Sequence, residues 1–208
     1  MGLHPHHATS ADEAAWAGLE ALAADPRVRA VGEIGLDFFR NLSPPDVQRD
    51  AFARQLDLAR RVGKPVLVHD RDAHEAVTSA LVAWMGDGAE AAPPGAASIR
   101  GVLHCFSGDA EMAATLAARG FLMSFALPVS FRSAAGPRAA AAQLADDAIL
   151  VETDAPYLGP GSDRRNEPTT TLRVAAELAR LRGTSPAAIA GAANANLGRL
   201  LQDDVIGP

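Results

Sequence analysis

The 208-residue sequence is poor in cysteine, lysine and aromatic residues, and it lacks long apolar runs. Cys105 is the only cysteine, so no disulfide can form within the chain, and a reducing cytoplasm suits it. No apolar run of about eighteen residues occurs, and no basic segment leads into an apolar stretch. We therefore expect a cytoplasmic protein without a membrane span or a signal peptide.

The balance of charge excludes a strongly basic surface. The formal net charge is -6, and Lys64 is the only lysine, every other cation being arginine. A chain with this charge has no general attraction for phosphate backbones, so any binding of nucleic acid must come from a local basic patch or from bound cations. The glycine-rich loops typical of nucleotide binding, G-x-G-x-x-G and G-x-x-x-x-G-K-[ST], do not follow any predicted strand, which disfavours a nucleotide-binding open sheet.

Short apolar segments alternate with longer helical patterns along one domain, residues 1–208. The segments 28–35, 65–69, 100–106, 121–127 and 148–155 predict strands, and the segments 46–62, 72–84, 109–119, 133–145, 168–182 and 186–202 predict helices. Strands that are apolar along their whole length and alternate with helices predict a parallel sheet covered by helices, an α/β fold. A closed β/α barrel and a doubly wound open sheet both fit this pattern.

Four polar residues stand where four predicted strands end. Glu33, His69, His104 and Asp154 each follow an apolar run, at separations of 36, 35 and 50 residues. Taken singly, such residues are usually helix caps, loop residues or hydrogen-bonded core histidines. Together at one edge of a parallel sheet they predict a catalytic face. Imidazole with carboxylate suits Zn or Mn, and carboxylates with water also admit Mg, so we expect one or two divalent ions.

Longer strings around these residues resemble a known family. VGEIGLDF, KPVLVHDRDAHE, GVLHCFSGD, ILVETDAPYL and RRNEP are similar to the motifs of the TatD family of metal-dependent deoxyribonucleases, in that family's order. The resemblance implies a TIM-type (β/α)8 barrel of the amidohydrolase superfamily and hydrolysis of DNA phosphodiesters from 3′ to 5′. It further implies that Glu33 contacts both ions, that His69 and His104 bind one, and that Asp154 binds the other and orients the attacking water.

The N-terminal MGLHPHH resembles the motif that ends the third barrel strand of this family. The family's first strand ends in an H-x-H pair that supplies two metal ligands, and no such strand precedes this motif here. We therefore expect a barrel that lacks about its first two strands, and impaired activity. By the same resemblance His4 contacts substrate, and we expect His6 and His7 in the following loop, away from the chemistry.

The remaining predictions concern the substrate and the rival functions. Arg71, Arg165 and Asn166 are candidates to hold DNA phosphates, the alternative for the arginines being surface ion pairs. Glu152 is a candidate partner for a metal ligand. Another hydrolase of the same superfamily, acting on a lactone, an amide or a small phosphoester, would need the same ligands, and a catalytically inactive barrel is a third possibility. We expect DNA as the partner and no membrane, and the sequence gives no oligomeric state.

Overall fold

The structure is a computed structural model that describes residues 1–86, 99–159 and 165–201. In these ranges five strands form one parallel sheet in chain order, β1-β2-β3-β4-β5. The strands are β1 Val31–Asp37, β2 Val66–Arg71, β3 Gly101–Leu103, β4 Phe121–Phe125 and β5 Ile149–Val151. The helices are α1 Glu13–Ala24, α2 Pro45–Val62, α3 His74–Met85, α4 Ala110–Ala117, α5 Ala135–Gln143, α6 Thr171–Arg182 and α7 Pro186–Leu201, with short 3-10 helices η1 Pro5–Ser10, η2 Leu127–Ser130, η3 Asp146–Ala148 and η4 Pro168–Thr170.

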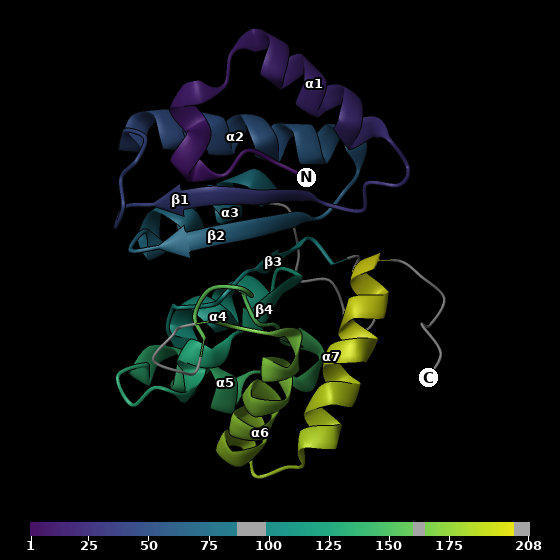
Figure 1. Cartoon of the computed structure of the whole chain (residues 1–208). Helices are drawn as coiled ribbons and strands as arrows, with labels where there is room; N and C mark the ends of the chain where they lie inside the picture. Colours follow the sequence, from purple (N-terminus) through teal and green to yellow (C-terminus); the bar gives the residue numbers. More distant parts are fainter. Residues whose placement is uncertain (87–98, 160–164, 202–208) are drawn as a thin grey trace.

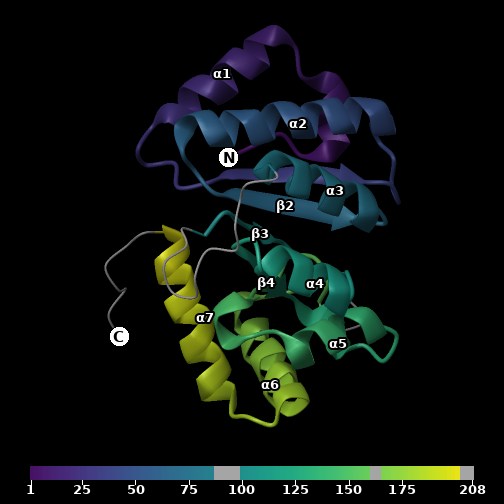
Figure 2. The ribbon, with the colours of Figure 1, turned by 180° about the vertical axis from the view of Figure 1, so that it is seen from behind.

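The helices form two groups on the sheet. In Figure 1, α1 and α2 lie over β1 and β2, whereas α5, α6 and α7 gather beside β3 and β4, and Figure 2 shows the same division from behind. None of the helices in the described ranges combines the length and the apolarity that a membrane crossing requires.

The strands are buried on both faces, as their continuous apolar runs predict. Every residue of β3 and β4 is buried. Because side chains alternate along a strand, Val102, Leu122 and Leu150 pack on one face of the sheet with Leu200 of α7. Their neighbours along the strands point the other way, into the larger core around α3, α4 and α6. Most of the sheet is therefore an internal layer.

Helix α2 illustrates how local sequence sets an element. Pro45 occupies the first turn, where its missing N–H costs nothing, and Phe52 and Leu56 recur at helical spacing on the buried face. Gly63 ends the helix at a φ of 67°, a left-handed conformation that favours glycine. The predicted helices do not include α1, in which Trp16 and Ala23 are the buried residues.

Strand β1 carries an irregularity that places a functional residue. Its pairing with β2 runs from Gly32–Leu67 to Ile34–Val68, so Glu33 has no partner on β2. An extra residue of this kind is a β-bulge, which re-aims a side chain out of the regular alternation. Close packing continues at Gly35, where a Cβ would lie 2.0 Å from the His69 carbonyl oxygen. Glycine at that position therefore lets β1 approach β2 beside His69.

The five predicted strands are confirmed, and so is their parallel arrangement. The described strands do not close into an eight-stranded barrel, since β1 and β5 each pair with one strand only. The first residues of the chain lie along the free edge of β1, where the Met1 carbonyl accepts the Gly32 N–H at 2.9 Å and the Met1 amino group donates to the Ala30 carbonyl at 3.0 Å. Main-chain groups of that edge are thus partly satisfied.

Candidate metal centre

The four predicted ligands come from four strands but not all from strand ends. Glu33 lies at the bulge within β1, which continues to Asp37, so the prediction that it ends the strand was wrong. His69 lies two residues before the end of β2, and His104 directly follows β3. Asp154 follows β5 at a φ of 60°, an uncommon conformation for a residue other than glycine.

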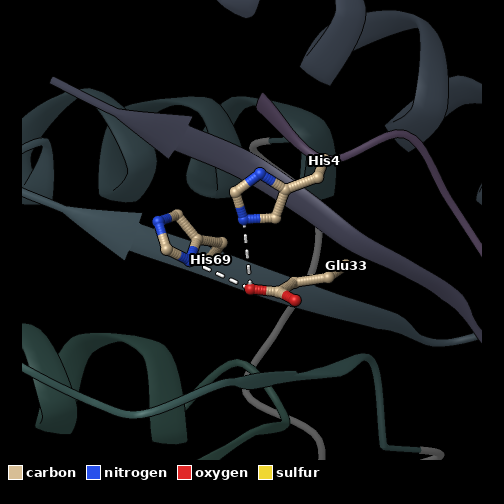
Figure 3. A group of neighbouring side chains, drawn as sticks. All are labelled: His4, Glu33 and His69. Atoms are coloured by element: carbon tan, nitrogen blue, oxygen red, sulfur yellow. Dashed lines mark hydrogen bonds and ion pairs between the residues drawn. The ribbon is translucent and has the colours of Figure 1, made fainter. Parts of the chain in front are cut away.

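One oxygen of Glu33 is shared by three histidines. Its Oε1 lies 3.0 Å from Nδ1 of His69, 3.4 Å from Nε2 of His4 and 3.8 Å from Nε2 of His104. Figure 3 shows His4 and His69 converging on this carboxylate. The His4 and His69 rings hold the pKa of Glu33 well below its usual range, against the effect of burial, so the carboxylate stays charged at neutral pH. Glu33 is the centre of the site.

His104 connects Glu33 to the carboxylates after β5. Its Nε2 lies 3.6 Å from Oδ1 of Asp154, and its Nδ1 lies 2.6 Å from Oε2 of Glu152. Burial would lower the pKa of His104, but the hydrogen bonds with Asp154 and Glu152 raise it to about 10. Glu152 therefore contacts a candidate ligand, as the sequence suggested, and it also accepts the Cys105 N–H.

A buried carboxylate that sequence reasoning missed lies behind His69. Asp37, the last residue of β1, is fully buried. Its Oδ2 lies 3.2 Å from Nε2 of His69 and 2.7 Å from Nε2 of His6. Despite the cost of its burial, the pKa of Asp37 is lowered, chiefly by the backbone N–H of Arg40 and then by these two histidines. The expectation that His6 lies away from the chemistry was wrong, because η1 turns its ring back toward β1; the exposed His7 has no such contact. A carboxylate at the end of an apolar strand was the available signal.

The donor set fits a divalent cation. One ligand atom each from His4, Glu33 and His69 lies within 4.8 Å of the other two, the one such group of three within the described ranges. Imidazole nitrogens with a carboxylate oxygen are the donors that Zn and Mn accept. His104 and Asp154 supply further donors of the same kind beside this group, since Nε2 of His104 lies 3.8 Å from Oε1 of Glu33 and 3.6 Å from Oδ1 of Asp154.

The predicted substrate residues lie in different surroundings. His4 is one of the three residues whose ligand atoms lie within 4.8 Å of one another. Arg71 ends β2, with its guanidinium carbon 4.1 Å from the ring centre of Phe39. The side chain of Arg165 is 74% exposed, and its Nε lies 3.8 Å from Oε1 of Glu167. These three remain accessible to a ligand at the carboxyl end of the sheet.

Asn166 differs because its side chain is occupied within the chain. It is 3% exposed, its Nδ2 donates to the Thr153 carbonyl at 2.5 Å, and its Oδ1 accepts the Glu167 N–H at 2.9 Å. Its own N–H donates to the Pro156 carbonyl at 3.0 Å. These contacts hold the segment that carries Asp154, and they favour an anchoring role for Asn166 over the predicted contact with substrate.

Comparison with known proteins identifies relatives along the whole described chain. The family model described as TatD related DNase matches residues 1–202. A protein of Mycobacterium tuberculosis (strain H37Rv), described as an uncharacterized metal-dependent hydrolase TatD, is 44% identical over 188 residues, 86% of this chain and 67% of that protein. The 3′-5′ ssDNA/RNA exonuclease TatD of Escherichia coli (strain K12) is 36% identical over 203 residues, 94% of this chain and 74% of the relative.

A solved structure has the same fold. The crystal structure of YJJV, a TatD homolog from Escherichia coli, superposes with a TM-score of 0.83 at 29% identity, over 96% of this chain and 74% of that one. The family match begins at residue 1, and the expected shortening at the N-terminus is not borne out. The match over residues 1–202, together with these identities, shows that the chain belongs to the family of TatD related DNases.

Proposed function

We propose that this protein is a metal-dependent hydrolase that cleaves DNA phosphodiester bonds, with the 3′-to-5′ exonuclease activity that the name of its Escherichia coli relative states. The observation that carries the proposal is the Glu33 carboxylate, which lies beside His69 and His104, with Asp154 facing the same Nε2 atom of His104 that faces Glu33. We also propose that the parallel sheet is part of a TIM-type barrel. A cytoplasmic location and the choice among Mg, Mn and Zn stay predictions.

In this proposal the residues bind cations, orient the attacking water or bind phosphate. Glu33, His69 and His104 would hold one cation, and Glu33 with Asp154 would hold a second. Such cations neutralise charge on a scissile phosphate and make water a stronger nucleophile at neutral pH. The Asp154 carboxylate is the group that orients the attacking water and accepts its proton, and so catalysis rests on Asp154 and Glu33. Arg71 and Arg165 would bind flanking phosphates, since the net charge of -6 gives no general attraction for DNA.

Turnover is expected to be slow. Among the described residues, the second cation would be held by two side chains, Glu33 and Asp154, so its occupancy should depend on a high concentration of free metal ion. The rate of hydrolysis should therefore keep rising with the Mn²⁺ concentration until the second position is saturated.

The test is hydrolysis of single-stranded oligonucleotides labelled at either end, with Mn²⁺ or Mg²⁺ and with EDTA. We expect stepwise shortening from the 3′ end that EDTA abolishes and that Asp154→Asn removes, while the exposed control His7→Gln is unaffected. Aryl esters, lactones and small phosphoesters are assayed with the same preparation. Metal-dependent hydrolysis of one of these, with no cleavage of DNA, would replace the proposal by the rival hydrolase. Absence of every activity in a protein that binds metal would favour an inactive barrel.

A further inference from the structure

His4 and His69 both face Oε1 of Glu33, but their other ring nitrogens have opposite partners. In His4 the second nitrogen, Nδ1, meets a backbone N–H. In His69 the second nitrogen, Nε2, meets a carboxylate. Because a neutral imidazole carries one proton on one of its two nitrogens, the second partner decides which nitrogen is left to bind a cation.

For His4 the partner is the amide of His6. The His6 N–H lies 3.1 Å from Nδ1 of His4, in a tight turn at the start of η1. An amide N–H can only donate, so Nδ1 must accept and carries no proton. The proton of His4 is therefore on Nε2, the atom that lies 3.4 Å from Glu33. A protonated nitrogen donates a hydrogen bond and has no lone pair to offer a cation.

For His69 the partner is Asp37. The Oδ1 atom of this buried carboxylate accepts the backbone N–H groups of Phe39 at 3.1 Å and Arg40 at 2.7 Å, which fixes the group as an acceptor. The buried side chain of Gln48 holds the backbone of Asp37. The Oε1 atom of Gln48 accepts the Asp37 N–H at 2.8 Å, and its Nε2 atom donates to the Asp37 carbonyl at 3.1 Å. Nε2 of His69 therefore donates to Oδ2, and the lone pair of Nδ1 points at Glu33, 3.0 Å away. Two acceptor atoms this close are held together by a cation or a proton between them.

His6 links the two arrangements. Its backbone N–H sets His4, and its ring Nε2 lies 2.7 Å from the same Oδ2 atom of Asp37 that faces His69. One turn of chain thus fixes the orientation of both rings around Glu33.

We propose that Asp37 is a positioning residue that holds His69 with its proton on Nε2, so that Nδ1 is the metal ligand, and that His4 is not a ligand but donates its Nε2–H to Glu33. The proposal rests on the proposed function only in requiring that a divalent cation binds at Glu33. Carboxylate partners of this kind typically change metal affinity by about 10- to 100-fold.

The first test is ¹⁵N NMR of the imidazole rings in the full chain, which has six histidines. It needs no variant except His4→Gln and His69→Gln for assignment. We expect His4 with an unprotonated Nδ1 and a protonated Nε2, with and without Zn²⁺. In the Zn²⁺-loaded protein His69 should carry its proton on Nε2. A proton on Nδ1 of His4, or Zn²⁺ at Nε2 of His69, overturns the proposal.

The second test is titration with Co²⁺, followed by its visible absorption and by competition with a chromophoric chelator. Asp37→Asn should weaken Co²⁺ binding by about 10- to 100-fold and alter the absorption spectrum, as expected when a ligand turns. His4→Gln should retain Co²⁺ binding, because the glutamine NH₂ group can still donate to Glu33, whereas His69→Gln should abolish it, and His7→Gln is the control. If His4→Gln weakens Co²⁺ binding as much as His69→Gln, or if folded Asp37→Asn binds like the wild type, the assignment fails.

Thermal unfolding of each variant shows whether it is folded, and if Asp37→Asn is not, the NMR measurement on the wild-type chain decides. Neither readout uses DNA. A protein that binds Co²⁺ as expected but hydrolyses no DNA would contradict the proposed function and leave the roles of Asp37 and His4 standing.

Discussion

Glu152 fixes the ring of His104: its Oε2 lies 2.6 Å from Nδ1, so Nε2 is the nitrogen that faces Glu33 and Asp154. The other oxygen of the same carboxylate accepts the Cys105 N–H, so Glu152 is itself held in place. His104 therefore presents Nε2 to the site, whereas His69 presents Nδ1, each because of the carboxylate behind it.

Replacing this carboxylate by an amide should loosen the metal centre. We expect Glu152→Gln to weaken Mn²⁺ binding by about 10- to 100-fold, because the amide can turn its NH₂ group toward Nδ1 and reverse the proton position on His104. Isothermal titration with Mn²⁺ measures this. Glu111→Gln, an exposed residue of α4, is the control. Equal affinities of the two variants would mean that Glu152 does not orient the ring.

Arg71 should contribute to the binding of single-stranded DNA. Its guanidinium lies over the Phe39 ring at the carboxyl end of the sheet. We expect Arg71→Gln to weaken binding and to reduce the slope of log affinity against log salt by about 0.7, the value for one phosphate contact on a single strand. Fluorescence anisotropy with a labelled oligonucleotide in EDTA measures both.

Arg49→Gln is the matched control for this prediction, because Arg49 of α2 also lies over an aromatic ring, that of Phe38, at 4.9 Å. If both variants change the salt dependence equally, the effect reflects net charge and not a phosphate contact at Arg71.

Asn166 should act through stability. Asn166→Ala leaves the half-buried Thr153 carbonyl without its side-chain donor, so we expect a loss of about 1 kcal/mol in the free energy of unfolding, measured by urea denaturation. Activity should fall because Asp154 follows Thr153 directly, while the affinity for single-stranded DNA in EDTA stays the same. Unchanged stability with weaker DNA binding would instead support the contact with phosphate predicted from RRNEP.

Acid should weaken the contact between α5 and α6. Oε1 of Glu177 lies 2.6 Å from Nη1 of Arg138 and 2.7 Å from Nη2 of Arg180, and these arginines, Arg180 foremost, lower the pKa of Glu177 to about 2. A lowered pKa stabilises the fold above the unfolded value of 4.5, and this stabilisation is lost as the pH falls toward 2.

Glu177→Gln should therefore cost about 1 kcal/mol at pH 7, a figure reduced for solvent screening, and almost nothing near pH 2. Urea denaturation across this pH range measures the difference from the wild type. A deficit that stays constant as the pH falls would mean that the amide disturbs packing and not charge.

The sequence predicted the strands because each is apolar on both faces, and it indicated the four candidate ligands because charged groups are rare beside such runs. It did not predict the bulge at Glu33, since pairing register depends on β2 and not on the local sequence of β1. Asp37 was missed because its partners are distant in the chain, with His6 31 residues before it and His69 32 residues after it. Burial of Asn166 likewise depends on contacts with the segment after β5.

The most direct test of the account is nucleotide release from a 3′-labelled single-stranded oligonucleotide by the wild type and by Asp154→Asn, each with saturating Mn²⁺ and with EDTA. The account predicts slow release by the wild type that requires Mn²⁺, and none above the EDTA background by Asp154→Asn. Release by Asp154→Asn at the wild-type rate, or release that persists in EDTA, would contradict it.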